Sequence, residues 1–284
     1  MSNRPTLDHL GWIGPDLAAG AAVWTRLGFA LSRISPQMGF TGPGGALEPW
    51  ASANRCAVFR SGYLELIGLT DPTRHNPWQA YLARGAGPHI AAFRVANADA
   101  AYPPLSVRVP GFDPPVQRRR MAPVGAAEDG GEVEMRFRNI FSQDAFWPEG
   151  RFIVIEHQTP KALWQPALMD HPNGAVALVE AIFTAPDPAP TAGRLEGLLG
   201  RPLAGGAGDT GVTILTPAAF ARRFPGAAAP DRPAVAAAVV RVPSLSRLLT
   251  LWAANGVLGT TTPDGAVFVH GPAAGGGVIA FTEA

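Results

Sequence analysis

Apolar residues near the N-terminus are spaced in a pattern that predicts one strand, one helix and three further strands. Residues 6–13 form a short, mostly apolar run typical of a buried strand, and residues 16–27 repeat apolar side chains at helical spacing until Gly28 ends the helix. Three more short apolar runs follow, at residues 30–35, 55–60 and 63–68, and a Ser-Gly turn joins the last two as a hairpin. The predicted order is β-α-β-β-β.

The same order of elements recurs along the chain, which indicates an internal duplication. A second unit is expected to have a strand at residues 89–95, a helix at 98–105, and strands at 115–122, 132–139 and 152–157. Two weaker copies follow. Their elements are expected at residues 175–184, 191–199 and 211–215 in the third unit, and at 234–242, 245–255, 266–270 and 278–282 in the fourth.

These repeats predict an α+β fold of four tandem βαβββ modules, paired into two half-open barrel domains. Residues 159–166 contain two prolines and separate the second unit from the third. We therefore expect a first domain over residues 1–160, which carries the candidate site described next, and a degenerate second domain over residues 161–284.

Two histidines and two glutamates occupy repeated places in the first two units. His9 and His89 lie in the opening strands, and Glu65 and Glu156 lie in the closing strands. Side chains two apart in a strand share a face, so Glu65 lies on a mostly apolar face, where an unpaired charge is costly. A metal ion would offset that cost. Imidazole and carboxylate ligands suit Zn, Ni, Mn, Co or Fe alike, so the predicted cofactor is a divalent metal of unspecified identity, held by all four residues.

These repeated units and their His and Glu residues resemble a known superfamily. The βαβββ units, with His on the opening strand and Glu on the closing strand, resemble the vicinal oxygen chelate (glyoxalase, bleomycin resistance and extradiol dioxygenase) proteins. Residues 54–59 leading into 62–66, together with 84–89 and 171–175, resemble the glyoxalase-like domain proteins of that superfamily. The resemblance implies paired modules around a metal ion that is chelated by two oxygens of a small substrate.

The chain also departs from that pattern. Glyoxalase I usually has one pair of units, whereas this chain has four, so glutathione chemistry is not implied. The third and fourth units have Glu180 and Ala236 at the opening positions and no glutamate in register on their closing strands, so we expect no metal there. Glu156 is followed by His157, and a shift of one residue in register would exchange the two.

Composition narrows the classes of partner and the compartment. The net charge is +1, so the basic surface of a nucleic-acid binder is not expected. No run of eighteen apolar residues and no secretion signal occur, which predicts a cytoplasmic protein without a membrane partner. Cys56 is the only cysteine, so a disulfide framework is excluded. Four units can pair within one chain, which leaves a monomer and a homodimer open.

The predicted function is that of a metal-dependent enzyme acting on a small oxygen-rich substrate, as a lyase, an isomerase or a dioxygenase, with Glu65 or Glu156 as the catalytic base. Two pairs of arginines, Arg118 with Arg120 and Arg136 with Arg138, would favour an anionic substrate if they point into the concave face. The alternative is a metal-free protein that binds or sequesters a small ligand on the same fold. An adaptor that docks through the second domain is a third candidate.

Overall fold

Residues 6–157 form one curled sheet of eight strands. In the computed structural model, which describes residues 3–40, 46–125, 131–203 and 210–283, the strand order is β2-β3-β4-β1-β5-β8-β7-β6. The central strands β1 and β5 are antiparallel, and each is parallel to the closing strand of its own unit. The first unit contains β1 (Thr6–Gly14), β2 (Ser35–Phe40), β3 (Leu47–Val58) and β4 (Tyr63–Leu69), and the second contains β5 (Gly87–Arg94), β6 (Val116–Pro123), β7 (Glu132–Phe141) and β8 (Arg151–His157).

One helix in each unit covers the outer face of this sheet. α1 (Leu17–Arg26) begins after Asp16 and α3 (Ala98–Arg108) begins after Asn97, and each of these side chains accepts a hydrogen bond from a backbone N–H of the first helical turn. Such N-caps satisfy donors that the helix itself leaves unpaired. The two caps mark the same point in the two units, and they give a reference from which corresponding residues can be counted.

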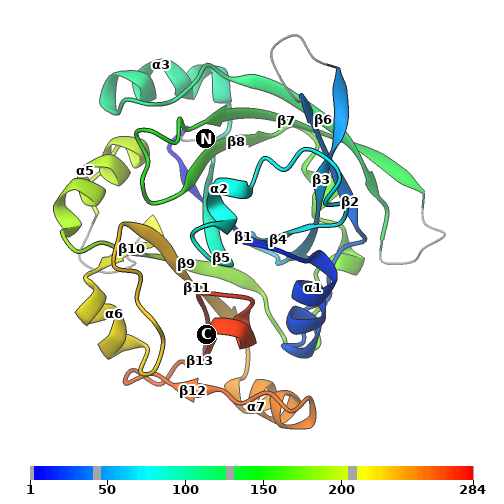
Figure 1. The fold of residues 1–284 in the computed structure, drawn as a ribbon, viewed down its shortest axis with the longest axis vertical. Coiled ribbons are helices and arrows are strands. Elements are labelled where there is room, and N and C mark those ends of the chain that lie inside the picture. Colours follow the sequence, from blue (N-terminus) through cyan, green and yellow to red (C-terminus); the bar gives the residue numbers. More distant parts are fainter. Residues whose placement is uncertain (1–2, 41–45, 126–130, 204–209, 284) are drawn as a thin grey trace.

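The sheet curls until its two edge strands approach each other (Figure 1). Arg120 on β6 donates a hydrogen bond to the Ser35 hydroxyl on β2, and its guanidinium lies 3.5 Å from Asn54 Oδ1 on β3. These contacts cross from the second unit back to the first. The eight strands therefore form a nearly closed barrel with a concave inner face.

Two apolar plugs close the ends of the barrel interior. At one end α2 (Gln79–Leu82) contributes Tyr81, which clusters with Ile13, Ile67, Trp78 and Ile90. At the other end α4 (Pro160–Leu163) and the short helix η1 (Pro166–Leu168) contribute buried apolar side chains that cluster with residues of the sheet. Those sheet residues include Cys56, Tyr63 and Met135. The polar part of the concave face lies between the two plugs.

The third and fourth units form a second sheet of six strands in the order β10-β9-β11-β14-β13-β12. β9 and β11 pair antiparallel at its centre, as β1 and β5 do in the first sheet. The third unit is shortened, because among the described residues a single strand, β10, follows its helix, and β10 pairs parallel with β9 as a closing strand does. The elements are β9 (Ala177–Thr184), α5 (Pro188–Leu199), β10 (Val212–Leu215), α6 (Pro217–Arg223), β11 (Ala234–Val242), α7 (Leu245–Ala254), β12 (Thr260–Thr261), β13 (Val267–His270), η3 (Gly271–Ala274) and β14 (Val278–Glu283).

The fold class predicted from the repeats is thus confirmed. One apolar core runs through both sheets, since Leu10 and Phe93 of the first sheet belong to the same buried cluster as Phe183 and Phe281 of the second. The division into domains at residue 160 stays a prediction. In the described parts of the chain, no helix is both long and apolar enough to cross a bilayer. The cytoplasmic location and the homodimer stay predictions as well.

Candidate active site

A cavity of about 490 Å³ lies on the concave face of the first sheet, and residues of both plugs border it. Strands of both units supply its lining. The first unit contributes His9, Tyr63 and Glu65, and the second contributes Ile90 and Ile153. The volume is in the range of pockets that bind small organic molecules.

His9 and Glu65 meet in this cavity, as the sequence analysis predicted for these two residues. Their strands are parallel neighbours, and His9 Nε2 lies 3.8 Å from Glu65 Oε2. The Asn54 side-chain amide donates a hydrogen bond to the other oxygen, Glu65 Oε1. The imidazole is almost fully buried, whereas the Glu65 side chain keeps 14% of its surface exposed. Of these two residues, Glu65 is therefore the one that a ligand can reach.

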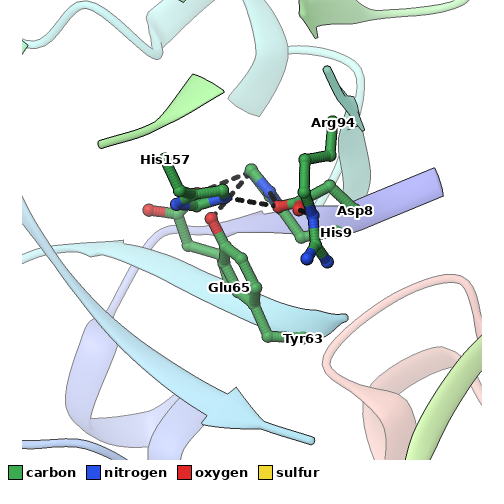
Figure 2. A network of polar contacts seen from close by, with 6 residues as sticks. All are labelled: Asp8, His9, Tyr63, Glu65, Arg94 and His157. Atoms are coloured by element: carbon green, nitrogen blue, oxygen red, sulfur yellow. Dashed lines mark hydrogen bonds and ion pairs between the residues drawn. The ribbon is translucent and has the colours of Figure 1, made fainter. Parts of the chain in front are cut away.

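Asp8 is a functional residue that the sequence analysis missed. It lies at a β-bulge of β1, where the register with β5 shifts between Leu7 and His9. A bulge can re-aim a side chain. The Asp8 carboxylate is fully buried, and Figure 2 shows it between the rings of His9 and His157, with Nδ1 of His9 at 2.9 Å and Nε2 of His157 at 3.1 Å.

Asp8 stays ionised in this position. Burial opposes its charge, but hydrogen bonds from His157 and His9 outweigh the burial and hold the pKa of the carboxyl well below its usual range. Arg94 adds a further bond, with Nε at 2.7 Å from Asp8 Oδ2. The ionised Asp8 accepts a hydrogen bond from His9 Nδ1, so Nε2 is the nitrogen of His9 that faces Glu65.

Tyr63 packs against the imidazole of His9 and helps to fix it. The two rings stack with their centroids 4.1 Å apart, and the Tyr63 hydroxyl lies 3.4 Å from His9 Nε2. Burial, with the nearby carboxylates of Asp8 and Glu65, raises the pKa of Tyr63 well above its ordinary value. Tyr63 is therefore a neutral phenol that can donate to Nε2.

His89 does not join His9 and Glu65 in the structure. Counted back from the helix N-caps, His9 and Ile90 each lie seven residues before the cap, so Ile90 is the counterpart of His9. Ile90 lines the cavity, whereas Nε2 of His89 lies 2.8 Å from the Gly85 carbonyl oxygen. Burial lowers the pKa of His89, against the opposing effect of that hydrogen bond. His89 acts here as a neutral donor to the backbone.

Glu156 also lies away from the pair. Its Oε2 accepts a hydrogen bond from the backbone N–H of Ala98 at 2.9 Å, at the start of α3 on the outer face of the sheet. Its neighbour Ile155 lines the cavity instead. The alternation of side chains along a strand explains the difference, since adjacent residues point to opposite faces.

His157, the alternative to Glu156 in the sequence analysis, is the residue that turns inward. Besides its bond to Asp8, its ring lies edge-on to Trp164 and to Phe137. Its Nδ1 is buried without a hydrogen-bond partner among the described residues. His157 therefore hydrogen-bonds the same Asp8 carboxylate as His9, and that carboxylate lies between the two imidazoles.

The donors present do not fit the four-ligand metal centre that the resemblance implies. Such a centre needs donors from both units, but the second unit places Ile90 and Ile153 at the inward positions. Among the residues that the structure describes, no group of three or more His, Cys, Asp or Glu side chains is arranged to hold an ion. We therefore derive no chemical step through a metal.

The cavity carries more positive than negative charge. Its lining contains four arginines but only two carboxylates, namely Arg118, Arg119, Arg120, Arg151, Glu65 and Asp113. Of the two arginine pairs singled out in the sequence, Arg118 and Arg120 border the cavity. Arg138 lies on the outer face, where it forms an ion pair with Asp99 at 2.7 Å, and Arg136 pairs with Glu134 at 3.7 Å. An anionic ligand would be attracted into the barrel.

Solved structures of low sequence identity share the fold. A hypothetical protein from Staphylococcus aureus is 9% identical, with a TM-score of 0.59, and the match covers 99% of this chain and 100% of that one. A mutant 4-hydroxymandelate synthase from Streptomyces coelicolor is 12% identical, with a TM-score of 0.59 and coverage of 99% and 92%. The Mn(II)-bound glyoxalase from Novosphingobium aromaticivorans is 14% identical, with a TM-score of 0.50 and coverage of 100% and 83%.

The sequence itself identifies the family. No curated protein matches the chain. A family model described as a glyoxalase-like domain matches residues 7–199, which include all eight strands of the barrel except the first residue of β1. This match covers more than half of the chain and agrees with the paired βαβββ units. The chain therefore belongs to the glyoxalase-like domain family.

Proposed function

We propose that this protein is an enzyme that moves a proton on a small oxygen-rich substrate bound in the barrel cavity, with Glu65 as the acid–base group. The position of Glu65 is the observation that carries the proposal. One carboxylate oxygen is fixed by Asn54, while the side chain remains partly exposed to a cavity of ligand size. A carboxylate held in this way has one face free to accept a proton.

The surrounding residues give Glu65 a defined task. His9 is held by Asp8 and Tyr63, and its Nε2 faces Glu65 at 3.8 Å, a distance that a small shift or one water molecule can bridge. In the proposed reaction Glu65 removes a proton from a carbon next to a carbonyl group and returns it to another atom. Arg118 and Arg120 would offset the negative charge that develops on the carbonyl oxygen. The reaction class is isomerisation or elimination.

A binding or sequestering protein is the second candidate. The two apolar plugs and the aromatic side chains of the cavity favour it, because they could enclose a flat ligand without any chemistry. Under this alternative Glu65 would be needed for shape or polarity only. The two functions therefore differ in whether the carboxylate of Glu65 is required for turnover.

Exchange of deuterium from solvent into candidate substrates tests the proposal directly. The protein would be incubated in D₂O with EDTA and a panel of 2-oxo acids and hydroxyketones, and exchange next to the carbonyl would be followed by NMR. We expect exchange with the wild type and a loss of about a hundredfold or more in Glu65→Gln. Glu156→Gln is the matched control and should exchange at the wild-type rate. Binding without exchange would support the second candidate, and exchange unaffected by Glu65→Gln would reject Glu65 as the acid–base group.

Metal content separates the proposal from the metal-dependent enzyme that the sequence predicts. His9 and Glu65 lie close enough to share an ion, so they are the residues to change. We expect elemental analysis to find far less than one ion per chain in the wild type, His9→Ala and Glu65→Ala alike. Near-stoichiometric metal that both variants lose would restore the metal-dependent mechanism.

A further inference from the structure

Three residues that line the same cavity each have a buried polar atom without a hydrogen-bond partner among the described residues. These atoms are Trp50 Nε1, Arg151 Nε and Asn139 Oδ1. A buried donor or acceptor without a partner costs about 1–3 kcal/mol, so native proteins contain few of them. The wall of this cavity is therefore a part of the barrel where polar groups of the described chain are left unsatisfied.

Arg151 is the most specific of the three. Its guanidinium carbon lies 5.5 Å from the ring centroid of Trp78 and 5.7 Å from that of Phe141. Trp78 is itself fixed, because its indole N–H lies 2.9 Å from Gln37 Oε1 and 3.0 Å from Ser52 Oγ. The aromatic rings hold the guanidinium in place by cation–π contacts.

Among the described residues, no carboxylate forms an ion pair with the Arg151 guanidinium. Arg94, Arg138, Arg194 and Arg223 each form an ion pair at 2.7 Å or less, whereas Arg151 forms no ion pair with a described residue and its buried Nε has no hydrogen-bond partner among them. A planar, preorganised guanidinium with free N–H groups is suited to a carboxylate, which it can bind through two parallel hydrogen bonds.

The strand register places Arg151 across the cavity from Glu65. Gly11 pairs with Glu65 on one side and with Ile90 on the other, and Ile90 pairs with Arg151. Glu65 and Arg151 thus belong to one row across four strands, about 14 Å along the sheet for three strand spacings of about 4.8 Å. Because the sheet curls and both side chains line the cavity, the two groups can contact opposite ends of one bound molecule.

We propose that the ligand of this cavity is a planar organic carboxylate whose carboxylate pairs with Arg151. Its flat body lies among the aromatic side chains that line the cavity, and the end opposite the carboxylate extends towards Glu65. This inference rests on the proposed function in that both use the same cavity, and it names the substrate class.

Calorimetric titration with three simple probes tests the inference. Benzoate has the charge and the flat ring, benzamide has the ring without the charge, and cyclohexanecarboxylate has the charge without the flat ring. We expect benzoate to bind at least tenfold more tightly than either of the others. Equal binding of benzoate and benzamide, or no heat from benzoate at millimolar concentration, would overturn the inference without requiring any variant.

Variants then locate the carboxylate. Arg151→Gln should weaken benzoate about ten- to hundredfold, to the level of benzamide, since it removes a charge-assisted pair. Arg151→Lys keeps the charge but not the planar fork and should lie between the two. Arg136→Gln, on an exposed arginine of the same sheet, is the matched control and should bind like the wild type. Unchanged benzoate affinity in Arg151→Gln would contradict the assignment.

The two proposals can fail separately. Glu65→Gln should still bind benzoate, because the carboxylate is held on the other side of the cavity. Selective benzoate binding together with absent deuterium exchange would reject the proton transfer and keep the ligand class. Exchange on a neutral hydroxyketone without any preference for carboxylates would reject the ligand class and keep the proton transfer.

Discussion

The two units of the barrel share one backbone plan but differ in the chemistry of their inward positions. Each unit has an opening strand, an N-capped helix on the outer face and a closing strand parallel to the first. At corresponding places the first unit has His9 and Glu65, and the second has Ile90 and Ile153. Packing and helix capping maintain the same backbone in both units. The polar pair of histidine and glutamate is present at the inward positions of the first unit alone.

The bulges of β1 and β5 extend this comparison. Asp8 and His89 are each the residue at which the register between the two strands shifts, and each lies eight residues before its helix N-cap. Asp8 is thus the counterpart of His89. At its bulge, Asp8 accepts hydrogen bonds from His9 and His157. At the other bulge, His89 donates a hydrogen bond to the Gly85 carbonyl. The same distortion serves the site in one unit and the backbone in the other.

The strongest test of this correspondence is to build the missing half of a metal site. If Ile90 and Ile153 are the counterparts of His9 and Glu65, then Ile90→His combined with Ile153→Glu should create a centre of two histidines and two glutamates. We expect the double variant to bind Zn²⁺ or Mn²⁺ about a thousandfold more tightly than the wild type, equivalent to about 4 kcal/mol. Metal titration by calorimetry and elemental analysis measure the change.

The wild type provides the control for that design. It already carries a histidine and a glutamate near these positions, His89 and Glu156, each on contacts away from His9 and Glu65. Tight metal binding by the wild type would mean that the side-chain directions described here are not those of the metal-bound protein. Equal, weak binding by the wild type and the double variant would break the proposed correspondence between the units.

The fold class could be predicted from the sequence alone, and so could the proximity of His9 and Glu65. His9 and Glu65 could be paired because each sits in a strand of the first unit with a clear apolar pattern, and β1 and β4 pair without a bulge. In the second unit the sequence pattern pairs His89 with His9, but the structural counterpart of His9 is the next residue, Ile90, and in a strand a shift of one residue reverses the face.

The remaining features depended on contacts that a sequence does not display. The role of Asp8 follows from a bulge and from His157, which lies far along the chain. One signal for the correct alignment was present, since Asp16 and Asn97 both precede helices and are residues of the kind that caps them. Counting back from these two caps would have placed Ile90, not His89, opposite His9.

A smaller effect should come from the network that only the first unit possesses. Asp8→Asn leaves the charge of Arg94 and the two histidines without their buried partner, and we expect the free energy of unfolding to fall by about 3 kcal/mol near neutral pH. The pKa of Asp8 is lowered in the folded protein, so its stabilisation is fully present above the ordinary value of 3.8 and is lost as the pH falls further. Urea unfolding at several pH values measures both.

The sign of the pH dependence makes this prediction specific. The difference in stability between the wild type and Asp8→Asn should be constant above about pH 5 and should shrink below pH 3.8. Asp99→Asn is the matched control, because Asp99 pairs with Arg138 at an exposed position in the first turn of α3, and it should lower stability by less than about 1 kcal/mol. A difference that grows toward acid pH would mean that the Asp8 carboxyl is not held ionised by its neighbours.

The smallest predicted effect separates the two closing-strand glutamates. Glu156 accepts a hydrogen bond from the Ala98 N–H at the start of α3, so Glu156→Ala removes a capping contact and a charge that favours the helix N-terminus. We expect the free energy of unfolding to fall by about 1 kcal/mol, with proton exchange at the wild-type rate. Glu134→Ala, on the exposed side of the neighbouring strand, should change neither quantity. Slower exchange in Glu156→Ala than in Glu134→Ala would give the second unit a share in the chemistry, because a glutamate that only caps a helix has no route to the substrate.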